Sequence, residues 1–213
     1  MISALTSCST ARYVAKTDMA LVRDIALVTP QAEISYMDSE GEMTEDAALS
    51  AETARLMSEA ILHSGIPITD IINLNEEMFD DDAADEIVAL QSMNPKKSGM
   101  TAIPPALDRL LEDHGKRYGL VVFSHGFDRD ARNYRKAVVR GTVIGLIVTV
   151  ATLGMFTMYE TPVRYLLDST VAIVDSETDE IIYFNHDARE ASPTREKHVE
   201  EQFERLIKKF CRR

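Results

Sequence analysis

The sequence predicts an α/β fold, with an α+β arrangement as the alternative, in which helices pack on one mixed sheet. Short apolar runs bounded by turn residues alternate along the chain with segments whose apolar residues recur at helical spacing. A further feature is a run of nineteen uncharged residues, Gly141–Tyr159, in a chain that is 27% charged. The predicted fold therefore contains one long apolar element (141–159) besides its sheet and helices.

The first part of the chain predicts two strands and a helix. An apolar run over 23–30 stops at a proline and predicts a strand, and residues 32–37 predict a loop or an edge strand before a turn at 39–41. Thr44 is expected to cap a helix that Gly65 ends. The inner face of this helix is expected to carry Leu49, Thr53, Met57 and Ile61.

Four further elements are predicted in the middle of the chain. Residues 66–72 predict a short strand at an end or an edge of the sheet, because its proline cannot donate a ladder hydrogen bond. Helices are expected over 81–92 and over 106–114, and Gly115 is the stop signal of the second. The strongest strand signal is the apolar run at 118–124.

The last quarter of the chain predicts a hairpin and a terminal helix. Strands over 169–174 and 180–185 flank a polar turn at 175–179. Ser192 is expected to cap the last helix, and the proline after it to open it. The apolar stripe of that helix comprises Val199, Phe203, Leu206, Ile207 and Phe210.

Composition limits the classes of partner. The net charge is −12 and tryptophan is absent, so no nucleic-acid partner is expected, because phosphate binding requires a basic surface. Residues 31–90 hold sixteen acids and a single base, whereas basic residues gather around 141–159 and at the C-terminus. This pattern fits an acidic side in solvent and a basic side on an anionic membrane. Acid-rich helices that only keep a domain soluble would also produce it.

Residues 1–22 are interpreted as a truncated signal sequence with a lipobox, followed by a tether to a single domain over 23–213. Leu5-Thr6-Ser7-Cys8 looks like a bacterial lipobox, in which the cysteine thiol carries diacylglycerol. Only seven residues precede Cys8 and none is basic, so most of a signal peptide is missing. Cys8 is the predicted lipidation site.

Three structures stay open for Gly141–Tyr159: a membrane helix, a pair of membrane-facing or buried strands, and a core element of the domain. Its length lies at the lower limit for a spanning helix, roughly 17–25 residues. Its small-xxx-small spacing allows close helix packing, whereas its many β-branched residues favour strands. The residues expected at a membrane or subunit interface are Gly141, Ile144, Gly145, Val148 and Phe156.

The order of elements, together with the hairpin TVAIVDSETDEIIYFNH at 170–186, resembles small bacterial envelope lipoproteins. Their domain is similar to the amino-terminal domain of the Tol translocation β-propeller protein and to the periplasmic domain of the curli secretion lipoprotein. The resemblance implies a lipid anchor at Cys8, a periplasmic location and a role in assembly or scaffolding, with no catalytic residues to carry over. An insertion forms the membrane barrel in curli secretion relatives, and residues 133–168 occupy a comparable place as a candidate membrane- or interface-facing insertion.

Catalytic and metal sites are not predicted. The segment VVFSHGF at 121–127 resembles a strand of α/β-hydrolases, but the Gly-x-Ser-x-Gly sequence that carries their nucleophile does not occur. His125 is therefore expected to end a strand and to bond to the backbone. The acidic run at 80–86 lacks the glycine turn of a calcium loop. The five histidines have no metal-ligand spacing, and His186 and Asp187 are expected on the surface. No cofactor is expected.

The sequence thus predicts a non-enzymatic, membrane-anchored envelope lipoprotein that faces the periplasm and has a structural or assembly role. Its expected partners are the membrane, through Cys8 and residues 141–159, and either further copies of itself or an envelope protein. The alternative is a soluble α/β domain that binds a ligand or partner and holds residues 141–159 in its core.

Overall fold

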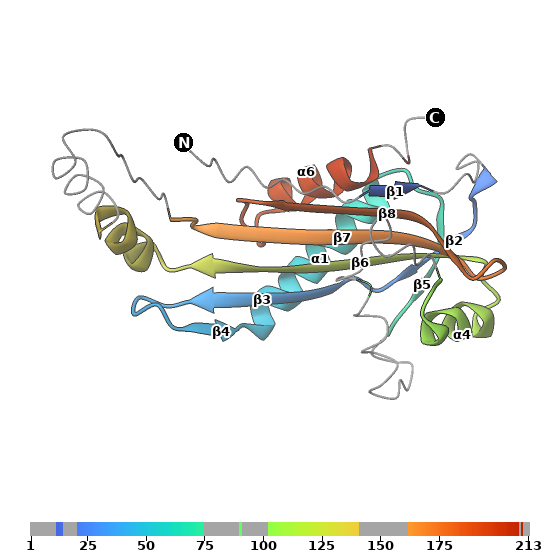
Figure 1. The fold of residues 1–213 in the computed structure, drawn as a ribbon, viewed down its shortest axis with the longest axis horizontal. Helices are drawn as coiled ribbons and strands as arrows, with labels where there is room; N and C mark the ends of the chain where they lie inside the picture. Colours follow the sequence, from blue (N-terminus) through green and yellow to red (C-terminus); the bar gives the residue numbers. More distant parts are fainter. Residues whose placement is uncertain are drawn as a thin grey trace.

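An eight-stranded mixed sheet with helices packed on it organises the chain (Figure 1). The structure is a computed structural model that describes the backbone of residues 12–14 and, in full, residues 21–74, 90, 102–140, 162–208 and 210. The predicted α/β class is confirmed. The helix expected over 81–92, apart from Leu90, and the apolar element 141–159 lie outside the described residues.

The strands are β1 (Arg12–Val14), β2 (Ile25–Val28), β3 (Gln31–Met37), β4 (Met43–Glu45), β5 (Ile68–Ile72), β6 (Tyr118–Arg129), β7 (Tyr165–Asp175) and β8 (Glu180–Arg189). The labelled helices are α1 (Ala47–His63), α4 (Pro105–Asp113) and α6 (Glu196–Ile207). Residues 131–140 form a further helix directly after β6.

The long strand β6 is the centre of the sheet. One edge of β6 pairs in parallel with β2 near its start and with β3 over Phe123–Arg129, so two consecutive strands share this edge. The other edge pairs antiparallel with β7 along nearly its whole length, and β8 and β1 continue the sheet beyond β7. The residues at 32–37 are thus a true strand, held between β4 and β6.

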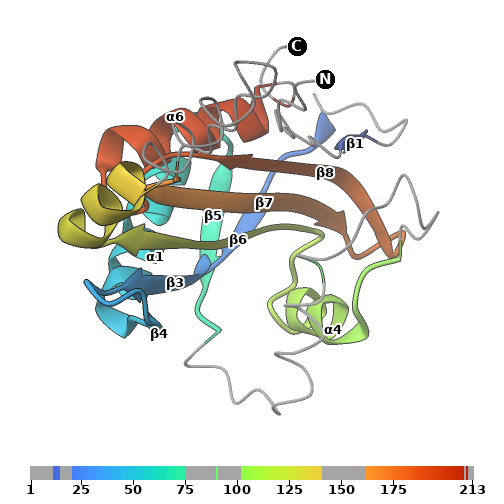
Figure 2. The same cartoon turned by 60° about the vertical axis from the view of Figure 1, so that its left-hand side comes forward.

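Helices lie on both faces of the sheet, but they cover the two faces unequally (Figure 2). On one face α1 packs against α6, and both bury apolar side chains such as Met57 and Phe203 against Leu120 and Val171. On the other face α4 covers one end, where Leu107 contributes to a second apolar cluster. Each buried side chain of this size contributes about 1.5–3 kcal/mol to folding.

Two predicted helix starts are wrong, in each case because nearby tertiary contacts compete with the local signal. Thr44 lies in β4, paired with Tyr36, and Asp46 caps α1 by accepting from the N–H groups of Ala48 and Leu49 at 2.9 and 3.1 Å. Of the four side chains expected on the inner face, Thr53, Met57 and Ile61 are buried and Leu49 is half-buried. Ser50 is also buried, and its hydroxyl accepts from the backbone N–H of Ile34 in β3 at 2.9 Å.

The last helix begins at Glu196 and not at the expected proline. Residues before it form a turn in which the backbone N–H of Ser192 donates to Nδ1 of His198 at 3.0 Å. All five residues of the predicted apolar stripe are buried. At the far end of α6, the carbonyl of Leu206 accepts hydrogen bonds from Tyr183 and from Asn185, so the strand supplies the donors for a helix terminus.

Other stops and turns agree with the sequence. Gly65 and Gly115 follow α1 and α4 with φ angles of +78° and +61°, which glycine adopts without steric cost. The hairpin of β7 and β8 turns at 176–179, but both strands extend further than the predicted ranges. Of the candidate insertion 133–168, residues 133–140 are helical and Tyr165 onward belongs to β7.

Candidate functional site

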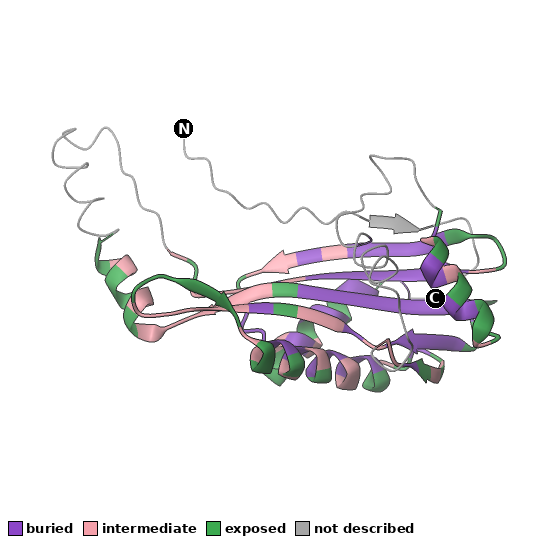
Figure 3. Cartoon of the chain, turned by 90° about the horizontal axis from the view of Figure 1, so that it is seen from below, coloured by how far each residue is buried: buried purple, intermediate pink, exposed green. Residues whose placement is uncertain are grey.

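One end of the sheet presents an accessible face. Along β6 the residues are buried from Tyr118 to Ser124 and exposed or half-buried from His125 to Arg129, and Figure 3 shows this change toward the end that carries helix 131–140. This accessible face is the face of the sheet on which α4 packs, and α4 covers only the opposite end of it. Alternation along the paired strands places Glu33, His125, Asp168 and His186 on it together.

Asp168 lies between two imidazoles from the strands on either side of it. His125 of β6 is its direct cross-strand partner, with Nε2 3.4 Å from Oδ2 of Asp168. His186 of β8 approaches from the opposite side, with Nδ1 3.1 Å from Oδ1 of Asp168. The hydroxyl of Thr170 also lies 3.3 Å from this His186 nitrogen. Three adjacent strands therefore contribute one titratable side chain each to a single cluster.

The carboxylate of Asp168 is the buried member of the cluster. Its side chain is 15% exposed, whereas that of His125 is 49% exposed. Burial raises the pKa of Asp168 above its ordinary value even though both imidazoles oppose the rise. Its Oδ1 atom accepts no hydrogen bond from the described residues, so the 3.1 Å approach of His186 is a close contact and not a directed hydrogen bond.

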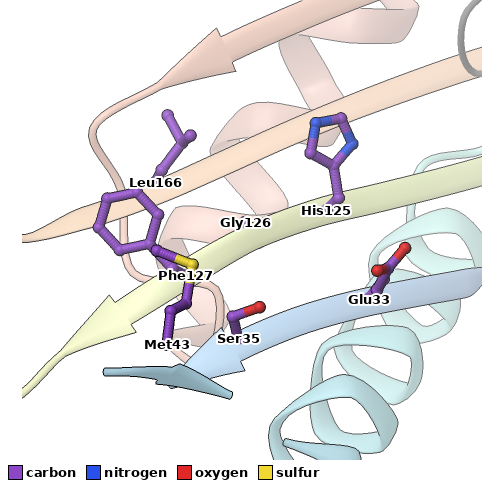
Figure 4. A pocket seen from close by; sticks show the side chains of 7 residues that line it. All are labelled: Glu33, Ser35, Met43, His125, Gly126, Phe127 and Leu166. Atoms are coloured by element: carbon purple, nitrogen blue, oxygen red, sulfur yellow. The ribbon is translucent and has the colours of Figure 1, made fainter. Parts of the chain in front are cut away.

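A shallow depression of about 390 Å³ adjoins the cluster on the same face (Figure 4). Its lining combines polar and apolar side chains: Glu33, Ser35, Met43, His125, Gly126, Phe127 and Leu166. Figure 4 shows Phe127, Met43 and Leu166 gathered at one end and His125 and Glu33 at the other. This arrangement suits a ligand or a peptide segment with an apolar part and a polar part.

A basic helix projects from the same end of the molecule (Figure 1). Residues 131–140 include Arg132, Arg135, Lys136 and Arg140 and no acid, and none of the ten is buried. Asp130 caps the helix by accepting from the N–H groups of Arg132 and Asn133 at 2.7 and 3.2 Å, and these bonds hold the pKa of Asp130 below its usual range.

Two contacts hold this helix against the sheet. Lys136 Nζ donates to the carbonyl of Ser39, 3.2 Å away in the turn between β3 and β4. The guanidinium of Arg164 lies over the rings of Tyr134 and Tyr165, 5.9 and 4.7 Å from their centroids. The helix is thus fixed to the end of β6 and β7.

All the residues predicted to have a function lie outside the described part of the chain. They are Cys8, Gly141, Ile144, Gly145, Val148 and Phe156. The acidic run at 80–86, for which no function is predicted, also lies there. Among the described helices, none combines the length and the apolar character needed to cross a membrane.

Two predictions about polar residues are wrong. His125 does not end its strand, because β6 continues to Arg129 between β3 and β7, and its ring faces Asp168. Asp187 is buried and not on the surface, with Arg205 Nε 3.3 Å from its Oδ2, since β8 continues to Arg189 beneath α6. His186 is half-buried.

No local sequence signal marks Asp168, although it is the member that joins the two histidines. The local pattern around it, YLLDSTVAIV, is that of an ordinary strand. Alternation could have indicated that Asp168 and Thr170 share a face, but the alignment of β7 with β6 and β8 decides which histidines meet it.

No protein-family model matches the sequence, and no curated protein does. Several solved structures are similar to the chain. The PelC dodecamer from Paraburkholderia phytofirmans is 10% identical, with 96% of this chain and 97% of that chain covered and a TM-score of 0.44. Lipoprotein GNA1162 from Neisseria meningitidis is 11% identical, with 90% and 100% covered and a TM-score of 0.34.

The C-terminal domain of LpoB from Salmonella enterica is 12% identical, with 80% of this chain and 87% of that chain covered and a TM-score of 0.31. Identities this low, with TM-scores of at most 0.44, establish neither a family nor a function for the chain.

Proposed function

We propose that the protein is a membrane-anchored component of the bacterial cell envelope, that it faces the periplasm, and that it acts in structure or assembly and not in catalysis. The observation that carries the proposal is the basic helix 131–140, which leads directly into the uncharged run Gly141–Tyr159. Cations beside an apolar segment are what an anionic membrane surface attracts.

The charges of this helix are available for such a surface. Its arginines at 132, 135 and 140 are exposed, and the helix lies at the end of the sheet, away from α4. Each cation close to an anionic leaflet contributes about 1 kcal/mol, so the four side chains together supply up to ~4 kcal/mol at low ionic strength. This attraction is sufficient to orient a protein that a second anchor already holds at the membrane.

The second anchor in the proposal is a lipid on Cys8, as the lipobox-like sequence before it implies. Gly141, Ile144, Gly145, Val148 and Phe156 are then the proposed contacts with the membrane or with another subunit. Further copies of the chain, or an envelope protein, are the proposed partners in assembly.

Vesicle flotation tests the part assigned to the helix. The purified full chain is mixed with vesicles of phosphatidylcholine, with or without phosphatidylglycerol, at low salt and at about 0.5 M salt, where exposed charges are screened. We expect flotation with the anionic vesicles at low salt, and its loss when the four basic residues of the helix are replaced by glutamine. A control variant carries glutamine at Arg109 and Lys197, two exposed cations of α4 and α6, and should float like the parent.

Cell fractionation of the parent and of Cys8→Ala, each expressed in the native host, tests the anchor. If the parent follows the membranes and the variant becomes soluble, the lipid is the anchor. If both follow the membranes, residues 141–159 hold the protein there. If both are soluble, the proposal is wrong.

A second candidate function is a soluble domain that binds a ligand or partner. The depression beside His125 favours it, because Phe127 and Leu166 offer apolar surface at one end of the depression and Glu33 offers a carboxylate at the other. A soluble parent protein in the fractionation experiment would leave this function as the better proposal.

A further inference from the structure

We propose that the depression beside His125 binds an extended segment of a partner protein, in which a basic residue stands two positions from an apolar one. The inference rests on the part of the proposed function that gives the chain a protein partner, and it requires no membrane anchor. The depression lies on the face of the sheet, whereas the proposed membrane association uses helix 131–140.

The shape of the depression favours a segment of polypeptide over a small molecule. A pocket for a small ligand encloses most of the surface of that ligand. The depression is shallow, and three of the side chains that line it, Glu33, Met43 and His125, are exposed. A polypeptide segment can place two side chains in such a depression while its backbone stays outside.

The spacing between the two ends of the depression matches an extended chain. His125 and Phe127 are alternate residues of β6, and their cross-strand partners on β3 are Glu33 and Ser35. Alternate residues of a strand point to the same face and lie about 6.6 Å apart. Side chains two positions apart in an extended partner have the same separation. One of them can therefore reach the polar end at Glu33 while the other reaches the apolar end at Phe127.

Charge decides which side chain of the partner goes to which end. The carboxylate of Glu33 is exposed, and no cation among the described residues is paired with it. Asp168 adds a second carboxyl group at this end, with its Oδ2 3.4 Å from Nε2 of His125. At the apolar end, the guanidinium of Arg129 lies 5.8 Å from the centroid of the Phe127 ring. A lysine or arginine of the partner is therefore attracted to the end at Glu33 and repelled from the other end.

The apolar end has surface left to bury. Met43 is 51% exposed, and Phe127 and Leu166 are half-buried. Figure 4 shows these three side chains gathered at one end of the depression. An aromatic or aliphatic side chain placed among them removes apolar surface from water, and this burial is the main contribution to the affinity.

Fluorescence anisotropy with two labelled peptides tests the proposal on the purified full chain, at low salt and without vesicles. In one peptide a lysine and a phenylalanine stand two positions apart in a background of serine and threonine, and in the other peptide glutamate replaces the lysine. We expect the parent to bind the lysine peptide about fivefold more tightly, which corresponds to about 1 kcal/mol from exposed charges. Glu33→Lys should reverse this preference, and Phe127→Ser should weaken binding of the lysine peptide by about tenfold or more.

Glu204→Lys is the matched control, because it makes the same change of charge at an exposed residue of α6, on the opposite face of the sheet. It should keep the preference of the parent, and circular dichroism should show that all variants are folded. The proposal is overturned if the parent binds both peptides alike or neither of them, or if Glu33→Lys leaves the preference unchanged. It is also overturned if sedimentation shows a dimer that Phe127→Ser dissociates, because a second copy then covers this face. Since the assay contains no membrane, its failure would leave the result of the flotation experiment unchanged.

Discussion

Replacing Gly126 by alanine would press a methyl group into the backbone of the neighbouring strand. A Cβ atom at this position would lie 2.0 Å from the carbonyl oxygen of Leu166 in β7, whereas real Cβ atoms essentially never come closer than 3.0 Å. Because the obstacle is backbone, no side-chain rotation relieves it, and β6 and β7 must separate by about 1 Å.

The cost follows from the hydrogen bonds that this separation breaks. A ladder bond of about 2.9 Å lengthens to about 3.9 Å, which is beyond hydrogen-bond distance. With two neighbouring bonds affected, at about 1–2 kcal/mol for each buried group left unpaired, Gly126→Ala should lower the free energy of unfolding by about 2–4 kcal/mol. For a chain of this length that corresponds to a loss of roughly 4–16 °C in Tm.

Urea denaturation and thermal melts of the full chain measure this loss. Gly65→Asn is the matched control, because Gly65 has a φ of +78° with nothing within 4 Å, and asparagine tolerates this conformation. Because a side chain at this positive φ is strained even with open space around it, the control should lose about 1 kcal/mol, which is less than the loss expected for Gly126→Ala. A Gly126→Ala protein as stable as the control would refute the reasoning, since it would mean that the two strands can part without losing their bonds.

Three further predictions concern buried or half-buried polar groups. Arg117→Met removes the guanidinium that donates to both oxygens of the buried Asp175 at 2.9 and 2.8 Å. The free energy of unfolding measured in urea should fall by about 2–3 kcal/mol, which is less than for a fully buried ion pair because about half of the arginine is exposed. Adding Asp175→Asn to this variant should recover part of the lost stability, because it removes the unpaired buried charge. If nothing is recovered, that charge is not the cause of the loss. Asn185→Ala removes the donor 2.6 Å from the Leu206 carbonyl and should cost about 1–2 kcal/mol, so an unchanged denaturation midpoint would exclude the bond. Burial raises the pKa of Asp128, so folding favours the protonated form of this carboxyl group. Asp128→Asn should therefore be more stable than the parent at pH 7. In thermal melts at decreasing pH the difference should shrink and vanish below about pH 4, where the carboxyl group is protonated in both states.

Local pattern was enough to predict the elements that carry their own signals. The apolar run at 118–124, the turn between β7 and β8, and Gly115 after α4 are found where the sequence places them. The stripe of α6 from Val199 to Phe210 is buried throughout. In these cases the period of apolar residues or the conformational freedom of one glycine is enough to predict the element. The sequence signal and the structure that it forms span the same few residues.

Long-range pairing decided where several elements begin and end. The apolar run of β6 stops after Phe123, yet the strand continues to Arg129, because β3 and β7 supply hydrogen-bond partners on both of its edges. Thr44 has the chemistry of a helix cap, but pairing with Tyr36 holds it in a strand and leaves Asp46 to cap α1.

The sequence by itself determined the mixed α/β fold and the sites of its turns. Only the tertiary structure decided that His125, Asp168 and His186 meet on one accessible face. Alternation along a strand shows which residues share a face, but a shift of one residue in pairing would move every side chain of a strand to the other face. The register of β6, β7 and β8, which is set by packing over the whole sheet, therefore determines which polar side chains come together.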